Sequence, residues 1–467
     1  MTQLQTSINS RFQSWLSPQN RILIGLMAPS VMVGMSHHMF GVALPSLRAA
    51  FALDADTAAW ASMVYTLPFM ALMPLYGRLG DGLGKRRLIL VGTLIFLLGA
   101  TIVLTAANFT WFMVGQAIQG VGTAGFVPLS IAIIAQWFAP NERGKVMGAW
   151  NSIIPLTGLS VPYVGGLLVD AFGWRAIYPP VLLAGLLALW IVRHNIPTLG
   201  ARQVDPNFLR SFDWPGVVLL SGALVTLLFY TSSRPITGVE GLRDWRLLLL
   251  CLALFGALIF WEKRRRQPYI DLQLFANRNF TAASFCAGLR MFLMSSISFM
   301  LPLYLTDVHQ LSASAIGIAL ALQAGMLFLI SRAGGQLADR WGSRRPVLLS
   351  MDGLIVVMAL LAILPASTPV WLLYLVAALH GLIIGLSLAP LHRSSMHSIS
   401  ESQTGGAAGL YSMIRFAGQI LGVAVAGVAL QAGLAQLTSP IMAYQLAFWL
   451  YTGVAVLALL IGLGVRD

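Results

Sequence analysis

The chain has 467 residues, of which 57% are hydrophobic and only 10% are charged, and its mean hydropathy is +0.79. So little polar surface excludes a water-soluble globular protein of this length. The formal net charge of +13 would suit a nucleic-acid-binding protein. The placement of the basic residues, described below, instead indicates a membrane surface, so no nucleic-acid partner is expected.

In chain order, fourteen apolar stretches are each long enough, at about 20 residues, to cross a hydrocarbon core of about 30 Å as a helix. Their apolar residues form continuous runs and do not alternate with polar ones, which excludes a transmembrane β-barrel. The expected fold class is therefore an all-α membrane protein. The spans lie near residues 21–44, 58–76, 88–106, 111–136, 146–169, 177–195, 214–232, 246–261, 280–305, 313–334, 346–364, 370–390, 405–430 and 441–464.

The basic residues indicate the orientation of these spans. With the amino terminus in the cytoplasm, the inner segments carry most of the 29 Lys and Arg residues, and the outer loops carry only Arg48, Arg175, Arg234, Arg243 and Arg246. This is the positive-inside pattern, so both termini are expected in the cytoplasm and the protein in a plasma membrane, the inner membrane in a bacterium. The first apolar run lacks a clear cleavage site and is expected to remain as helix 1.

The two cysteines, Cys251 and Cys286, both fall within expected spans. They provide neither a disulfide framework nor metal-ligand spacing, so no metal and no cofactor is expected. The sequence also contains nothing that resembles a nucleotide-binding loop, so ATP is not the expected energy source.

A short loop pattern occurs twice. The stretch GRLGDGLGKRR (77–87) joins expected helices 2 and 3, and GQLADRWGSRR (335–345) joins helices 10 and 11. Glycines allow tight turns and close helix approach, and an acid among basic side chains forms ion pairs that can break and re-form between conformations. For a single copy, the alternative interpretation is a basic turn that fixes the orientation of the helices in the membrane and does not move. Two copies favour conformational gating, by Gly77, Arg78, Asp81, Gly84 and Arg87 in the first and Gly335, Asp339, Gly342 and Arg345 in the second.

Four stretches together carry a resemblance: residues 77–87, IQGVGTAG (118–125), VPYVGGLLVDAFGWRAIY (161–178) and IRFAGQILGVAVAG (414–427). They resemble the major facilitator superfamily, and within it the fourteen-helix drug:proton antiporters. The resemblance implies the major facilitator fold, with two six-helix bundles, two inserted linker helices and a central cavity. It also implies multidrug-type efflux by alternating access, with a small-molecule substrate and protons as partners. The expected domains are a cytoplasmic segment 1–20, a bundle 21–200, a linker 201–275 and a bundle 276–467.

Three positions depart from that family pattern. Ser36 stands where the family has an acid, Gln116 where it has an arginine, and Val161 where a glycine precedes the proline. A coupled exchanger needs a group that titrates in its pathway, and histidine, with a pKa near 6.5, is the remaining candidate. The candidates are His37, His38 and His380; the alternative is neutral histidines that hydrogen-bond between helices, which is favoured for His380.

Arginines inside spans are functional candidates because a charge at the bilayer centre costs about 2.5–3.5 kcal/mol. Arg290 and Arg415 fall at such positions, and Arg415 shares a helix face with Tyr411. Arg332 lies close to a span end and can extend to the membrane surface. In the first bundle, Gln116, Gln119 and Asn151 are expected to line the pathway. Without an acid there, we expect a neutral, amphipathic or anionic substrate whose acidic group contacts Arg290 or Arg415.

Two other classes of function, a membrane enzyme and a sensor, compete with transport. A lipid-modifying membrane enzyme would need converging acid, base or metal-binding residues, and the densest polar stretch, LHRSSMHSISESQ (391–403), is interpreted as the loop between helices 12 and 13, with the next helix starting near 402–405. The chain is therefore not expected to be an enzyme. A transporter-like sensor and a facilitator without proton coupling remain alternatives. A periplasmic adaptor is not indicated.

Overall fold

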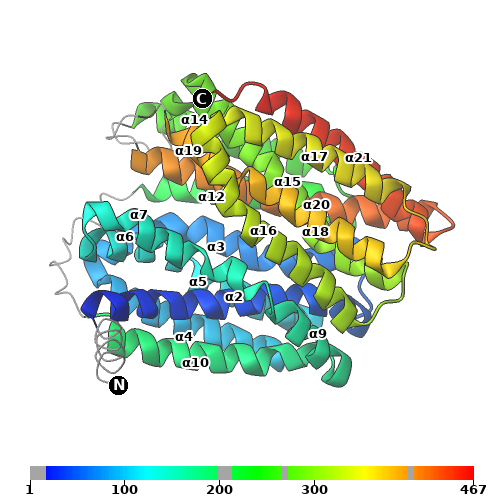
Figure 1. The fold of residues 1–467 in the computed structure, drawn as a ribbon. Helices are drawn as coiled ribbons and strands as arrows, with labels where there is room; N and C mark the ends of the chain where they lie inside the picture. The colour runs from blue at the N-terminus through cyan, green and yellow to red at the C-terminus, as the bar shows by residue number, and fades with distance from the viewer. Residues whose placement is uncertain (1–16, 198–212, 266–271, 398, 400–403, 467) are drawn as a thin grey trace, which may run out of the picture. The chain divides into compact units, whose positions relative to one another are not determined.

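The computed structural model describes residues 17–197, 213–265, 272–397, 399 and 404–466. Residues 1–16, most of the expected cytoplasmic segment, and residues 201–212 of the expected linker lie outside this range. Every regular element in the described residues is helical (Figure 1). The all-α prediction is therefore confirmed for this part of the chain.

Each expected span coincides with one helix or with consecutive shorter helices. The first six comprise α2 (Pro18–Ala50), α3 (Ala55–Leu83), α4 (Lys85–Leu104), α5 (Phe109–Thr123) with α6 (Phe126–Trp137), α7 (Pro140–Asn151) with α8 (Ile153–Thr157) and α9 (Val161–Phe172), and α10 (Tyr178–Asn195) after the 3-10 turn η1 (Trp174–Ile177).

The remaining eight spans follow in the same way. They are α12 (Trp214–Ser232), α14 (Trp245–Arg264), α15 (Arg278–Asp307), α16 (Ala313–Trp341), α17 (Arg344–Ile363), α18 (Val370–Leu386) with α19 (Leu388–His397), α20 (Thr404–Gln436) and α21 (Pro440–Gly462). The short α13 (Arg234–Thr237) follows α12, and the 3-10 turn η2 (Leu272–Ala276) precedes α15. Among the described residues, 13 helical segments are long and apolar enough to cross a membrane, and they correspond to every expected span except the second, which is helix α3.

One expected loop is wrong in part. Residues 391–397, assigned from sequence to the connection between helices 12 and 13, continue as helix α19. The helix forms because Leu391 and Ser395, four residues apart, lie on one buried face. The next helix begins at Thr404, within the predicted interval.

The contacts divide the chain into two compact units. The first comprises residues 1–38, 68–157 and 175–211, and the second comprises residues 39–67, 158–174 and 212–467. In the first unit, α4 packs against α5 and α10. A Cβ atom at Gly99 would meet the carbonyl of Gly115, and one at Gly122 would meet the carbonyl of Gly92. These glycines let the α4 and α5 backbones touch, as small residues do between membrane helices.

In the second unit, α15 packs against α20 and α21, α16 packs against α18 and α9, and α12 packs against α14 and α20. The backbones of α15 and α20 also touch, because a Cβ atom at Gly418 would collide with the carbonyl of Gly288 and one at Gly422 with that of Phe292. This backbone contact sets the relative position of the two helices that carry Arg290 and Arg415.

Candidate functional site

Arg290 on α15 and Arg415 on α20 lie on either side of one methionine. Arg290 Nη1 is 3.6 Å from the Met291 sulfur, and Arg415 Nη2 is 4.0 Å from the same sulfur. Arg290 is only 3% exposed, and Arg415 is half-buried. The two arginines predicted from sequence are therefore brought to one place in the second unit.

These two guanidinium groups have no carboxylate partner among the residues that the structure describes, where the ion pairs all join other side chains. Arg290 Nε is buried and makes no hydrogen bond within the described residues. An uncompensated buried charge is costly, and two adjacent guanidinium groups can donate bidentate hydrogen bonds to an anion. We call Arg290, Met291, Tyr411 and Arg415 the arginine site.

Tyr411 brings a second ring, that of His392, next to the arginine site. The Arg415 guanidinium carbon lies 5.6 Å from the centroid of the Tyr411 ring, which is buried. The His392 ring on α19 lies 5.4 Å from that of Tyr411, at an angle of 62°. His392 was missed from sequence because its segment was interpreted as a loop, although the spacing of Leu391 and Ser395 could have indicated a helix face.

His380, predicted as a pathway residue or as a packing residue, is 1% exposed on α18. The side-chain amide of Gln323 on α16 donates to its Nδ1 over 2.8 Å. A Cβ atom at the neighbouring Gly381 would collide with the Gln323 carbonyl, so α16 and α18 are in backbone contact there. This geometry suits an imidazole that hydrogen-bonds between two helices.

The other predicted pathway residues lie in the first unit. The rings of His37 and His38 on α2 are 5.5 Å apart in a T-shaped arrangement. His37 is exposed, whereas Nε2 of His38 donates to the Ile154 carbonyl over 3.1 Å. Ile154 belongs to the short helix α8, so this bond joins α2 to the segment where span 5 is interrupted.

The glutamines on α5 bond to each other. Gln119 Nε2 donates to Gln116 Oε1 over 3.0 Å, and both side chains are buried. Gln119 Oε1 is buried without a partner among the described residues. Asn151, at the end of α7, is exposed.

The two glycine-rich loops each turn at a glycine with positive φ, 89° at Gly84 and 78° at Gly342. Only glycine adopts this conformation readily, so it ends α3 before α4 and α16 before α17. Gly77 lies near Pro128, and Gly335 near Ala389. Arg87 and Arg345 are exposed, and the side chains of Arg78 and Asp81 lie outside the described part of the structure.

In the second loop, Asp339 pairs with Arg393, with 2.5 Å between Oδ1 and Nη1. Sequence reasoning expected the loop acids to contact basic side chains of their own loop. The partner lies instead on α19, in the stretch that was interpreted as a loop. Both side chains are exposed, so the pair is easily opened.

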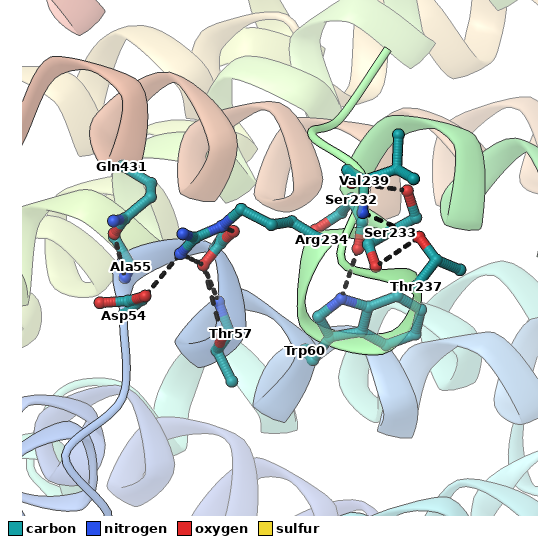
Figure 2. Close-up of polar contacts among 11 residues, drawn as sticks. Asp54, Ala55, Thr57, Trp60, Ser232, Ser233, Arg234, Thr237, Val239 and Gln431 are labelled. Carbon is teal, nitrogen blue, oxygen red and sulfur yellow. Dashed lines mark hydrogen bonds and ion pairs between the residues drawn. The ribbon is translucent and has the colours of Figure 1, made fainter. Parts of the chain in front are cut away.

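Ion pairs that sequence reasoning did not identify join α13 to the start of α3, and α2 to the end of α15, within the second unit. Arg234 pairs with Asp56 over 2.6 Å and with Asp54 over 2.5 Å (Figure 2). These carboxylates raise the pKa of the Arg234 guanidinium above its ordinary value, chiefly through the hydrogen bond to Asp56. Arg48 pairs with Asp307 over 2.7 Å, and Tyr444 donates to the same carboxylate.

Backbone groups extend this set of ion pairs. Figure 2 shows the Trp60 indole donating to the Ser232 carbonyl over 2.8 Å, and the Ala55 amide donating to Gln431 on α20 over 2.9 Å. The Asp170 carboxylate at the end of α9 accepts from the amides of Ala313 and Ser314, which begin α16. The sequence did contain an indication of these ion pairs, because the acids Asp54, Asp56 and Asp307 fall on the same predicted side of the membrane as the arginines of the outer loops.

The sequence profile described as Major Facilitator Superfamily matches residues 26–423 and 283–466. The chain is 26% identical over 412 residues to the riboflavin transporter RibZ of Clostridioides difficile (strain 630), covering 88% of this chain and 87% of that protein. It is also 26% identical over 453 residues to the quinolone resistance protein NorB of Staphylococcus aureus (strain JH9), covering 95% of each.

Solved structures show the same architecture. A bacterial homologue of the human lysosomal transporter Spinster, in an inward-facing and occupied conformation, superimposes with a TM-score of 0.70 at 14% identity, over 95% of this chain and 96% of that one. A D-xylose-proton symporter superimposes with a TM-score of 0.70 at 13% identity, over 96% of this chain and 97% of that one. At such identities, the likeness concerns the fold alone.

Proposed function

Because the chain belongs to the major facilitator superfamily, we propose that it exports a small amphipathic molecule, neutral or anionic, by alternating access. The observation that carries this proposal is the arginine site, where two guanidinium groups flank Met291 without a carboxylate among the described residues. An acidic group of the substrate would supply the missing charge and accept hydrogen bonds from Arg290 and Arg415.

The relatives support a small-molecule substrate. One is named a riboflavin transporter, another a quinolone resistance protein, and a third, from Bacillus subtilis (strain 168), multidrug resistance protein 3. We extend multidrug-type efflux to this chain as part of the proposal. The apolar body of the substrate would contact methionine and phenylalanine side chains, which adapt to varied shapes.

The proposed architecture comprises a first bundle at residues 21–200, a linker at 201–275 and a second bundle at 276–467. The chain is a multi-pass membrane protein, and we place it in a bacterial plasma membrane with both termini in the cytoplasm. The ion pair Asp339–Arg393 and the pairs of Arg48 and Arg234 would open and close as access alternates. The glycines of the two similar loops would keep the turns short during this movement.

Proton coupling is a separate part of the proposal. His37 and His38 are the candidates, because they lie on α2 beside the position where the family has an acid. Purified protein in vesicles with a pH-sensitive dye inside should show proton movement when an amphipathic acid is supplied outside. His37→Gln with His38→Gln should remove the proton signal. Proton movement that is unchanged in this double variant would contradict the assignment.

The substrate charge is tested at the arginine site. Arg415→Gln should lower the transport of an aromatic carboxylate about tenfold to hundredfold, since a hydrogen bond to a charged group contributes about 1.5–3 kcal/mol. Transport of the corresponding neutral amide should change far less. Arg332→Gln is the matched control, because Arg332 is an exposed arginine within α16. Equal losses for the acid and the amide would show that Arg415 acts through packing.

A facilitator without proton coupling is the second candidate. It is favoured by Gln116, which stands in place of a family arginine and is bonded to Gln119. Such a protein would move the carboxylate down its gradient with no dye response, in the wild type as well as in the histidine variants. A sensor that has lost transport would bind the carboxylate and show no flux at all.

A further inference from the structure

A cavity of about 420 Å³ lies in the second unit, away from the side chains of the arginine site. It is lined by α12, α14, η2, α15 and α20 and is open on one side, and it therefore lies between the linker pair α12–α14 and the second set of helices. Every residue that lines it is apolar or glycine. Leu224 lines it from α12, Ile259 from α14, Phe275 from η2 and Leu289 from α15.

The apolar lining of the cavity favours a hydrocarbon chain as its ligand. Apolar cavities of this kind stay dry, because a water molecule needs two to four polar partners. The volume is within the range of roughly 300–1,000 Å³ that is typical of ligand sites. Two lining residues, Ile259 and Phe285, are also 43% and 46% exposed on the helices that cross the membrane. The cavity therefore borders the bilayer interior, which supplies hydrocarbon chains.

Basic side chains lie beyond one end of the cavity. On α14, Phe255, Ile259 and Lys263 follow one another at four-residue spacing, so Lys263 extends the lining face to the end of the helix. On α15, Arg278 begins the helix two turns before the lining residue Phe285 and shares its face. Both basic side chains are exposed.

The two basic residues flank the same end of the cavity. Lys263 lies at the end of α14 and Arg278 at the start of α15, and Phe275 of the intervening η2 lines the cavity itself. A hydrocarbon slot that ends in two cations at the membrane surface matches the chemistry of an anionic phospholipid. A zwitterionic lipid would fill the cavity equally well, but the cation of its headgroup offsets its phosphate and would weaken the attraction to Lys263 and Arg278.

We propose that this cavity binds an anionic phospholipid, with one acyl chain between the linker pair and α15–α20 and with its phosphate against Lys263 and Arg278. The bound lipid would fill the space that the side chains leave between the linker helices and α15. The proposal does not depend on the transported substrate.

Native mass spectrometry tests it on full-length protein taken from vesicles of equal parts phosphatidylglycerol and phosphatidylcholine. The wild type should retain phosphatidylglycerol preferentially through detergent washing. Lys263→Gln with Arg278→Gln should lower the ratio of bound phosphatidylglycerol to phosphatidylcholine about tenfold. Lys145→Gln, which removes an exposed basic residue from the first unit, is the matched control and should leave the ratio unchanged.

A second variant tests whether the apolar cavity itself holds the acyl chain. Leu289→Trp fills the cavity and should reduce the retention of both lipids, while monodisperse elution confirms that the protein is folded. Equal retention of both lipids by the wild type would overturn the proposal, as would a ratio that the double variant leaves unchanged. Wild-type retention of phosphatidylglycerol by folded Leu289→Trp would overturn it as well.

Discussion

Arginine plays two different roles in the second unit. Arg48 near the end of α2 and Arg234 at the start of α13 each lie within 2.7 Å of a carboxylate oxygen. At the arginine site, Arg290 and Arg415 lie near a methionine sulfur and an aromatic ring, and neither forms an ion pair with a carboxylate of the described residues. A paired guanidinium holds helices together, whereas an unpaired one remains available to a ligand, so the nearest carboxylate decides which role the residue has.

The largest effect is expected from turning the unpaired arginines into paired ones. Met291→Glu places a carboxylate between Arg290 and Arg415, where the sulfur now contacts both. We expect transport of an aromatic carboxylate to fall by roughly a hundredfold or more, because the new side chain occupies the same hydrogen-bond donors. Initial uptake rates in vesicles measure this effect. Met291→Gln, equal in length but uncharged, should lose far less, and similar losses in both variants would argue against an anion site.

The opposite change removes the carboxylate partner of a paired arginine. Asp307→Asn leaves Arg48 without its carboxylate and weakens the acceptor of Tyr444. We expect the free energy of unfolding to fall by about 1–3 kcal/mol, because a charged hydrogen-bond partner is lost in a partly buried environment. Thermal unfolding in detergent measures the loss. Asp352→Asn, at an exposed acid on α17, is the control, and equal melting temperatures of the two variants would contradict a clamping role.

A smaller effect is expected at Arg234, whose side chain is 36% exposed. Arg234→Gln leaves the buried Asp56 without its guanidinium, and we expect a loss of about 1 kcal/mol, reduced by solvent screening. Arg243→Gln is the matched control. Arg243 pairs with Glu240, both side chains are exposed to solvent, and the pair should contribute nothing measurable to the free energy of unfolding. Arg234→Lys should not restore stability, because an ammonium cannot bond both carboxylates with the same geometry.

The smallest expected effect concerns pH. Burial lowers the pKa of His309, which follows α15 close to the Arg48–Asp307 pair. The folded state therefore favours the neutral imidazole, and its contribution is complete above the ordinary pKa of 6.5 and is lost as the pH falls through the lower folded value. Melting temperature should decline below pH 6.5 and should decline less in His309→Gln. Identical pH profiles would exclude a contribution from His309.

Much of the fold could be predicted because membrane spans are set by composition alone. Continuous apolar runs predicted the membrane spans, since a hydrocarbon core allows few alternatives to a helix. Gly84 and Gly342 indicated the turns between helices. The interruptions between α5 and α6, among α7, α8 and α9, and between α18 and α19 were not predicted. Gly125 lies in the first of these interruptions, and Pro155 and Pro390 lie just inside the helices that follow the others. A proline cannot donate to the carbonyl four residues before it, so it weakens the helix without lowering the hydropathy.

The candidate site was only partly predictable. A charge inside an apolar run is visible in sequence, so Arg290 and Arg415 could be found, but that they share Met291 depends on the contact of α15 with α20. Ion pairs such as Arg48–Asp307 join residues far apart in the chain, and nothing local specifies which acid meets which arginine. The apolar cavity lacks a sequence signature altogether, because its walls resemble any other membrane helix.

The backbone contact between Gly288 and Gly418 has a mechanical consequence for the arginine site. Since no side chain separates α15 from α20 there, the two helices cannot slide apart without losing that contact, and they should move as a rigid pair. The spacing of the two positive charges would then stay constant while other helices shift. A ligand held by both guanidinium groups would travel with this pair and would not be stretched between moving parts.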